Sequence, residues 1–158
     1  MKKFVYCLQN ALIEETLLKH KVISSRSIII RDKKNLTLKN LRKFKPDFIF
    51  FPHWSFIVEK KLTQEFNCIS FHSTPLPYGR GGSPLQNMIL RGHESTEVCS
   101  LLMTEKLDAG PIFLRKKISL QGTMEDILIR VYDEIARQIK VLKNKELTPL
   151  KQKGKVVK

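Results

Sequence analysis

The chain has 158 residues, 42% of them apolar and 28% charged, which is the composition of a globular protein with one core of ordinary size. This composition excludes collagen-like and largely disordered proteins, and no run of about 18 apolar residues predicts a membrane-spanning helix. The formal net charge of +14 allows a partner that carries negative charge, such as a phosphorylated substrate or a nucleic acid.

Hydrophobic patterns predict strands and helices that alternate along the first 92 residues. Strands are predicted at 2–8, 25–31, 46–52 and 67–72, and helices at 11–21, 37–44, 58–66 and 83–92. The last of these helices has Ser83 as its N-cap and Pro84 at its first position, a common start for a helix.

The second half of the chain continues with two strands, at 97–104 and 111–120, joined by the sequence EKLDAG. A long amphipathic helix follows at 123–143, where Thr123 and Asp126 fit a capping arrangement. Residues 144–158 form a basic tail that we expect to be poorly ordered. The pattern predicts one α/β domain at 1–143. It has three layers, with a mostly parallel, twisted, Rossmann-like sheet that carries helices on both faces.

Two basic regions account for much of the charge, one at 31–45 and one in the tail, where seven lysines and one glutamate lie between Lys140 and Lys158. Neither region is interleaved with aromatic residues in the way that single-strand binders require. We therefore interpret them as solvated lysine faces and do not expect a nucleic-acid partner. A positive field that attracts a phosphorylated substrate is the alternative.

The three cysteines, Cys7, Cys68 and Cys99, are an odd number at wide spacing. We interpret them as buried free thiols in a reducing cytoplasm. No two His or Cys residues lie at zinc-ligand spacing, so no metal is expected. The first residues reach acidic side chains too soon for a signal peptide, which also favours a cytoplasmic protein that does not enter a membrane.

The stretch FHSTPLPYGRGGSP, at 71–84, holds three prolines and three glycines and directly follows a predicted strand. Ligand crevices in parallel sheets lie beyond the carboxyl ends of the strands, where His72 is placed. A histidine there can give or take a proton near neutral pH. The alternative is a histidine that caps the strand end through backbone hydrogen bonds, and His72 alone does not decide between them.

Other residues near strand ends also have two interpretations. Asp108 can orient a histidine ring and stabilise its protonated form, or it can form a turn before Ala-Gly. Arg80 can bind a carboxylate or phosphate with its forked donors, or it can tie its own loop together. Ser83 can present helix amides to an anion or be a plain N-cap. His53 and Trp54 can line a pocket for a flat ring, or be a loop histidine and a core tryptophan.

The stretch from Cys68 to Phe113 resembles the core of the folate-dependent formyltransferase family. That family includes glycinamide ribonucleotide, methionyl-tRNA and sugar-nucleotide formyltransferases. Its signature places Asn-x-His at a strand end, then a proline-containing loop with Arg-Gly, and later Leu-Asp-x-Gly. Here His72 is followed by TPLPYGRGG and then by KLDAG, and His72 and Asp108 are 36 positions apart (108 − 72).

The resemblance implies transfer of a formyl group from 10-formyltetrahydrofolate to a primary amine, and we expect this amine to be a nucleotide-linked amino sugar of surface-glycan biosynthesis. It implies that His72 shuttles a proton, that Asp108 orients it, and that Ser70 takes the place of the family's oxyanion-binding Asn. It also implies that the pterin is bound by His53, Trp54, Ser55, Phe56, Met103, Thr104, Leu107 and Asp108. The acceptor is expected near Pro77, Arg80, Gly81, Gly82 and Ser83.

The sequence departs from the family at Ser70, because a serine hydroxyl is a shorter and less directed donor than an Asn amide. Ser70 can donate in an altered geometry, another group can replace it, or formyl transfer is weak or lost. The first half also lacks a Gly-containing turn after the first strand and is short. We therefore keep three alternatives: a methionyl-tRNA formyltransferase-like protein without the tRNA domain, a catalytically impaired folate-fold binding protein, and a truncated chain. A homodimer is also considered.

Overall fold

The computed structural model describes residues 1–158. Its helices and strands follow the predicted order, with strand ends that differ by a few residues. In chain order the elements are β1 (Phe4–Cys7), α1 (Ala11–Lys19), β2 (Ile28–Ile30), the 3-10 helix η1 (Lys33–Asn35), α2 (Leu38–Phe44), β3 (Phe48–Phe51), α3 (Lys60–Glu65), β4 (Cys68–His72), α4 (Pro84–Leu90), β5 (Ser95–Leu102), β6 (Ile112–Ser119) and α5 (Met124–Asn144).

The six strands form one sheet in the order β2-β1-β3-β4-β5-β6. The pairs β1–β2, β1–β3 and β3–β4 are parallel, whereas β4–β5 and β5–β6 are antiparallel. The mostly parallel sheet is therefore confirmed, and the direction reverses immediately after β4. As a result, the middle of β5 lies beside the carboxyl end of β4, where His72 pairs with Cys99.

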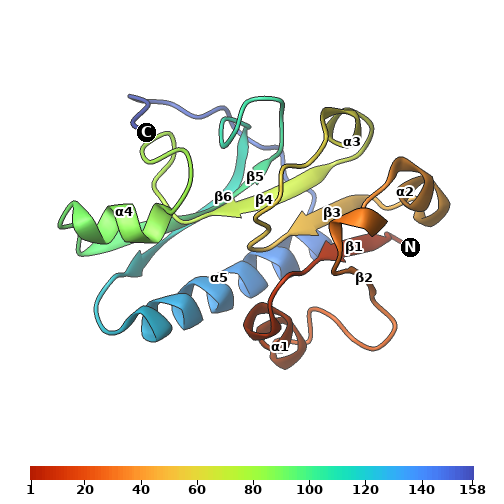
Figure 1. The fold of residues 1–158 in the computed structure, drawn as a ribbon, viewed down its shortest axis with the longest axis horizontal. Helices are drawn as coiled ribbons and strands as arrows, with labels where there is room; N and C mark the ends of the chain where they lie inside the picture. Colours follow the sequence, from red (N-terminus) through yellow and green to blue (C-terminus); the bar gives the residue numbers. More distant parts are fainter.

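Helices cover both faces of the sheet (Figure 1). On one face α1 and α5 pack over a core of 19 buried residues that includes Ile13, Phe50 and Ile135. On the other face α2 and α3 pack over nine buried residues that include Leu41, Leu62 and Cys68. This alternation follows from the side-chain period of two along each strand.

Polar side chains cap the starts of α1 and α5, and the cap of α5 is the one predicted from the sequence. Asn10 accepts from the Ile13 amide at the start of α1. At the start of α5, Thr123 and Asp126 form a full capping box. Ser83 is different. It occupies the expected N-cap position before α4, with φ of +53°, but its side chain makes no capping hydrogen bond.

The C-terminal tail, expected from its polar composition to be poorly ordered, instead packs against the body of the protein. Leu150 pairs with Ile112 at the start of β6, and Val157 pairs with Tyr78. Figure 1 shows this blue segment passing the β5–β6 loop and ending beside the loop that precedes α4. No helix is both long enough and apolar enough to span a membrane.

Candidate active site

The candidate site is built on the last three residues of β4. Cys68 belongs to the core under α2 and α3. Because side chains alternate along a strand, Ser70 and His72 point to this same face. Leu101 and Cys99 lie directly opposite them on β5. The topology therefore places a hydroxyl and an imidazole side by side, at the strand end where the sheet changes direction.

His72 is almost completely covered, with 8% of its side chain exposed. Its Nε2 lies 2.7 Å from the Gly79 carbonyl oxygen. A carbonyl oxygen only accepts, so this hydrogen bond assigns a proton to Nε2. Nδ1 is the remaining ring nitrogen, and it faces Asp108 with a distance of 3.6 Å to Oδ2. The ring is thus fixed at one nitrogen and has its other nitrogen beside a carboxylate.

Asp108 lies in the loop at 103–110, here called the Asp108 loop, with φ of +53°. Its Oδ2 accepts a hydrogen bond of 3.0 Å from the Gly81 amide. Gly110 is buried in the same loop, and a Cβ there would collide with the Leu102 carbonyl oxygen. In the Asp-Ala-Gly sequence, Gly110 therefore allows a close approach of two backbone segments, and Asp108 supplies the carboxylate beside His72. The structure brings the predicted pair His72 and Asp108 together.

The loop at 73–83, here called the Gly79 loop, is held by contacts along its whole length. The Thr74 hydroxyl donates to the Tyr78 carbonyl at 2.6 Å, and the Thr96 hydroxyl donates to the Ser73 carbonyl at 2.7 Å. Leu76 is buried with Cys99, Leu101 and Ile112. Gly79 has φ of +75°, a conformation that favours glycine. The prolines and glycines therefore fix the carbonyl that holds His72.

The residues predicted to bind the acceptor have different surroundings. Pro77 is buried, and Gly82 and Ser83 are exposed. The guanidinium of Arg80 donates to the side-chain oxygen of Gln152 in the tail, from Nε at 3.2 Å and from Nη2 at 2.9 Å. Arg80 thus ties its loop to the tail, a contact that neither interpretation of this residue included. Its contact with an anionic acceptor stays a prediction.

The two segments predicted to bind a pterin lie next to each other. Residues 52–59, here called the Trp54 segment, lead into α3, and Lys60 forms an ion pair with Glu105 of the Asp108 loop. Met103 packs against the α2 and α3 core. Ser55 donates to the Gln9 side chain, whereas Phe56 and Leu107 are exposed. The two segments therefore present exposed apolar side chains, Phe56 and Leu107, near the ion pair of Lys60 and Glu105.

Trp54 and His53 point in different directions. Trp54 packs edge-on against Phe51, with ring centroids 5.9 Å apart, and its buried Nε1 has no hydrogen-bond partner. His53 instead packs against Tyr132 of α5, and its Nδ1 hydrogen-bonds with the Tyr132 hydroxyl at 3.2 Å. Desolvation there lowers the pKa of His53, although the residue as a whole remains exposed. His53 therefore contacts α5, on the opposite face of the sheet from the core against which Trp54 packs.

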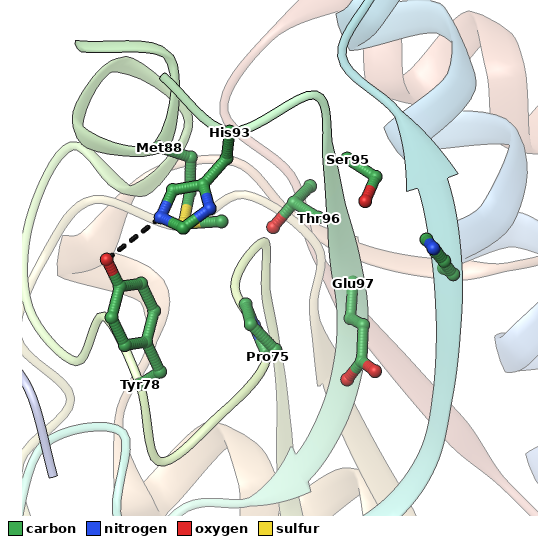
Figure 2. A pocket seen from close by; sticks show the side chains of 8 residues that line it. Pro75, Tyr78, Met88, His93, Ser95, Thr96 and Glu97 are labelled. Carbon is green, nitrogen blue, oxygen red and sulfur yellow. Dashed lines mark hydrogen bonds between the residues drawn. The ribbon is translucent and has the colours of Figure 1, made fainter. Parts of the chain in front are cut away.

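Two surface hollows flank this arrangement, and neither is lined by His72 or Asp108. One, of about 400 Å³, lies between η1 and α3 and has Trp54, Lys33 and Ile57 in its wall. The other, of about 420 Å³, lies behind the Gly79 loop. Figure 2 shows Tyr78 and His93 joined by a hydrogen bond on one side of it, and Glu97 on the other. Pro75 and Tyr78 of the Gly79 loop line this hollow, and His72 does not.

The three cysteines are free and buried, as expected. Burial raises the pKa of Cys68 to about 12 and that of Cys99 to about 11. Both thiols are therefore protonated at neutral pH and are poor nucleophiles. No group of three or more His, Cys, Asp or Glu side chains is arranged to hold a metal ion.

Comparison with known proteins identifies the family of this α/β fold. A family model described as formyl transferase matches residues 9–141, so the chain belongs to the formyltransferase family. This confirms the resemblance found in the stretch from Cys68 to Phe113. The methionyl-tRNA formyltransferase of Clostridium beijerinckii is 29% identical over 96% of this chain and 50% of that protein. The chain spans about half the length of the curated relatives that it matches.

Solved structures give the same fold. The methionyl-tRNA formyltransferase from Clostridium thermocellum has a TM-score of 0.92 and 34% identity, covering 99% of this chain and 71% of that chain. The formyltransferase PseJ from Anoxybacillus kamchatkensis was solved with UDP-4,6-dideoxy-4-formamido-L-AltNAc and tetrahydrofolate. It has a TM-score of 0.73 and 15% identity, covering 97% of this chain and 82% of that chain, so its similarity concerns the fold.

The sequence did not indicate how the tail meets the site. Gln152 donates to the carbonyl oxygens of Asp108 at 2.7 Å and Gly110 at 2.9 Å, in addition to accepting from Arg80. A single glutamine among lysines carries no pattern that predicts this contact, because the partners are backbone atoms far away in the sequence.

Proposed function

We propose that this protein transfers a formyl group from 10-formyltetrahydrofolate to a primary amine. The reaction breaks the bond between the formyl carbon and the folate nitrogen, forms a bond to the acceptor nitrogen, and moves one proton from that amine to the folate. The observation that carries the proposal is the placement of His72 Nδ1 3.6 Å from Asp108 Oδ2 at the end of β4.

This geometry suits a proton carrier. Nε2 is engaged by the Gly79 carbonyl, so Nδ1 is the position that takes a proton from the amine and later releases it. The Asp108 carboxylate stabilises the ring while it carries that proton. Asp108 is in turn held by the Gly81 amide, so the two groups keep their relative positions throughout.

Ser70 is the candidate donor to the oxygen of the reacting carbonyl group. Its side chain is two residues from His72 on the same face of β4 and makes no hydrogen bond within the protein. A hydroxyl at this position is available to the negative charge that develops on that oxygen.

The Trp54 segment and the Asp108 loop fit the donor. A pterin is flat and carries several hydrogen-bond acceptors. The exposed side chains of Phe56 and Leu107 offer apolar contacts for such a ring. The Nε1 of Trp54 is buried and has no partner, so it donates to the ring only when the Trp54 segment shifts on binding and uncovers it. An unpaired buried N–H is costly in the free protein, and a ligand acceptor removes that cost.

Two acceptors are supported by different observations. A nucleotide-linked amino sugar is supported by the fold shared with PseJ, which was solved with UDP-4,6-dideoxy-4-formamido-L-AltNAc. The amino group of methionyl-tRNA is supported by the relatives found by sequence, and the charge of +14 suits a polyanion.

The first experiment is titration of the protein with 5-formyltetrahydrofolate, a stable analogue of the donor, by calorimetry. We expect saturable binding that is weakened in Asp108→Ala. Thermal unfolding checks the same event, since a ligand at about 100 times its dissociation constant adds about 2.7 kcal/mol of stability. An absence of binding at millimolar ligand contradicts the proposed function.

Turnover then separates the acceptors. The protein is incubated with 10-formyltetrahydrofolate and either nucleotide-linked amino sugars or methionyl-tRNA, and release of tetrahydrofolate is followed. Formylation of tRNA with an affinity that falls steeply with salt supports the second acceptor. Formylation of an amino sugar, with no effect of added tRNA, supports the first.

A further inference from the structure

The C-terminal segment from 147 to 158 crosses both loops that hold the reacting groups. Leu150 and Ile112 exchange backbone hydrogen bonds of 2.8 and 2.9 Å, which extends β6 at its start. Farther along, the Val157 carbonyl accepts from the amides of Gly79 at 2.7 Å and Arg80 at 3.1 Å. The segment is therefore anchored on the Asp108 loop side and on the Gly79 loop side.

Gln152 lies between these two anchors, and its amide uses every hydrogen-bonding group that it has. Its Nε2 donates to the Asp108 carbonyl at 2.7 Å and to the Gly110 carbonyl at 2.9 Å. Its Oε1 accepts from two nitrogens of Arg80. One neutral side chain thus joins the backbone of one loop to the cationic side chain of the other.

These two loops control the geometry of the His72 and Asp108 pair. His72 is fixed to the Gly79 carbonyl, one residue before Arg80. The Asp108 side chain is fixed to the Gly81 amide, one residue after Arg80. A displacement of the Gly79 loop relative to the Asp108 loop therefore changes the distance between Nδ1 and Oδ2 directly.

We propose that Gln152 is a positioning residue for formyl transfer, which locks the Asp108 loop to the Gly79 loop and so sets the approach of Asp108 to His72. This inference rests on the proposed function. It assigns a role to a segment outside the residues matched by the family model, which end at 141.

Only an amide side chain satisfies both sides of this contact. A carboxylate keeps the contact with Arg80 but turns an oxygen toward the two carbonyl oxygens, which repel it. A cationic side chain lies against the Arg80 guanidinium. An apolar side chain of the same length loses all four hydrogen bonds. Gln152→Glu and Gln152→Met therefore separate the Asp108 side of the contact from the Arg80 side.

The experiment compares these two variants with Lys153→Met, which places the same apolar side chain at the exposed neighbouring position. Steady-state turnover gives kcat and KM, calorimetry gives the affinity for 5-formyltetrahydrofolate, and amide hydrogen exchange follows Gly81. We expect kcat to fall about 10–100-fold in both Gln152 variants, because a small misplacement of reacting groups has effects of this size. We also expect a smaller loss of donor affinity than of kcat, since the Asp108 loop also lies at the proposed donor site, and faster Gly81 exchange, with Lys153→Met like the parent.

A Gln152 variant that raises KM and keeps kcat overturns the proposal, because Gln152 then acts in binding. Unchanged Gly81 exchange overturns it as well, because the loops are then not coupled through this residue. If Gln152→Met fails to fold, Gln152→Glu, which keeps Arg80 paired, carries the same test. If the parent shows no formyl transfer with any acceptor, the proposed function fails, and Gly81 exchange still decides whether Gln152 joins the loops.

Discussion

The Gly79 loop and the Trp54 segment both follow a parallel strand of the sheet, yet they are held in very different ways. The Gly79 loop is fixed by Thr74, by the tail residue Val157 and by Asp108. The Trp54 segment leaves a buried indole N–H without a partner and exposes Ile57 almost completely, at 97%.

This difference indicates a division of labour. Groups that move a proton act best when the protein fixes them before the substrates arrive, because the entropic cost of ordering them is then not part of the reaction barrier. Groups that bind a flat ring gain affinity when the ligand completes their unsatisfied contacts. Substitutions in or beside the Gly79 loop should therefore change turnover, and substitutions in the Trp54 segment should change the affinity for the donor.

The largest effect is expected from His72→Ala, which removes the proton carrier. Turnover should fall about 10²–10⁴-fold, the usual contribution of general acid–base catalysis. Calorimetry with 5-formyltetrahydrofolate should show nearly the parent affinity, because the Trp54 segment is untouched. His93→Ala is the control, since this exposed histidine lines a hollow that does not include His72 or Asp108. Residual turnover close to that of the parent would remove His72 from the mechanism.

A smaller loss of turnover is expected from Ser70→Ala. A hydrogen bond to a charged acceptor contributes about 1.5–3 kcal/mol, which corresponds to a roughly 10–150-fold loss. Ser70→Asn restores the longer donor that is typical of the family. If Ser70→Asn greatly exceeds the parent, the parent is catalytically impaired. If Ser70→Ala leaves turnover unchanged, another group binds the oxyanion.

Gly79→Ala should disturb the Gly79 loop and so lower the stability of the folded protein. Gly79 has φ of +75°, and an added Cβ would lie 2.7 Å from Cγ2 of the buried Thr74. We expect a loss of about 1–3 kcal/mol in the free energy of unfolding, measured with urea, together with lower turnover. Gly82→Ala is a matched control for stability, because a Cβ at Gly82 has no atom within 4 Å. Equal stability of the two variants would contradict this role of Gly79.

Much of the fold was predictable from the sequence because it depends on local patterns. The apolar strands, the Thr123 capping box and the order of elements up to α5 all follow from side-chain period and capping chemistry. His72 and Asp108 were predictable as a pair only through their family spacing. The direction of His53 was not predictable, because it depends on Tyr132, which is 79 positions away.

The role of the tail was not predictable for the same physical reason. Composition suggested a solvated segment, since lysines dominate it. The contacts that order it join backbone carbonyls and one amide side chain to loops at least 40 positions away. Hydrogen bonds to backbone atoms place no requirement on the partner's residue type, so they leave no complementary pattern in the sequence.

The smallest effect is expected from Trp54→Phe, which tests whether the Trp54 segment binds the donor. The change keeps an aromatic ring against Phe51 but removes the Nε1 donor. One neutral hydrogen bond contributes about 1 kcal/mol, so the affinity for 5-formyltetrahydrofolate should fall about fivefold. The free energy of unfolding should change little or rise, because the free protein no longer buries an unpaired donor. An unchanged affinity in a more stable variant would mean that the indole N–H meets no ligand atom, and the donor would then have to be bound mainly by the Asp108 loop.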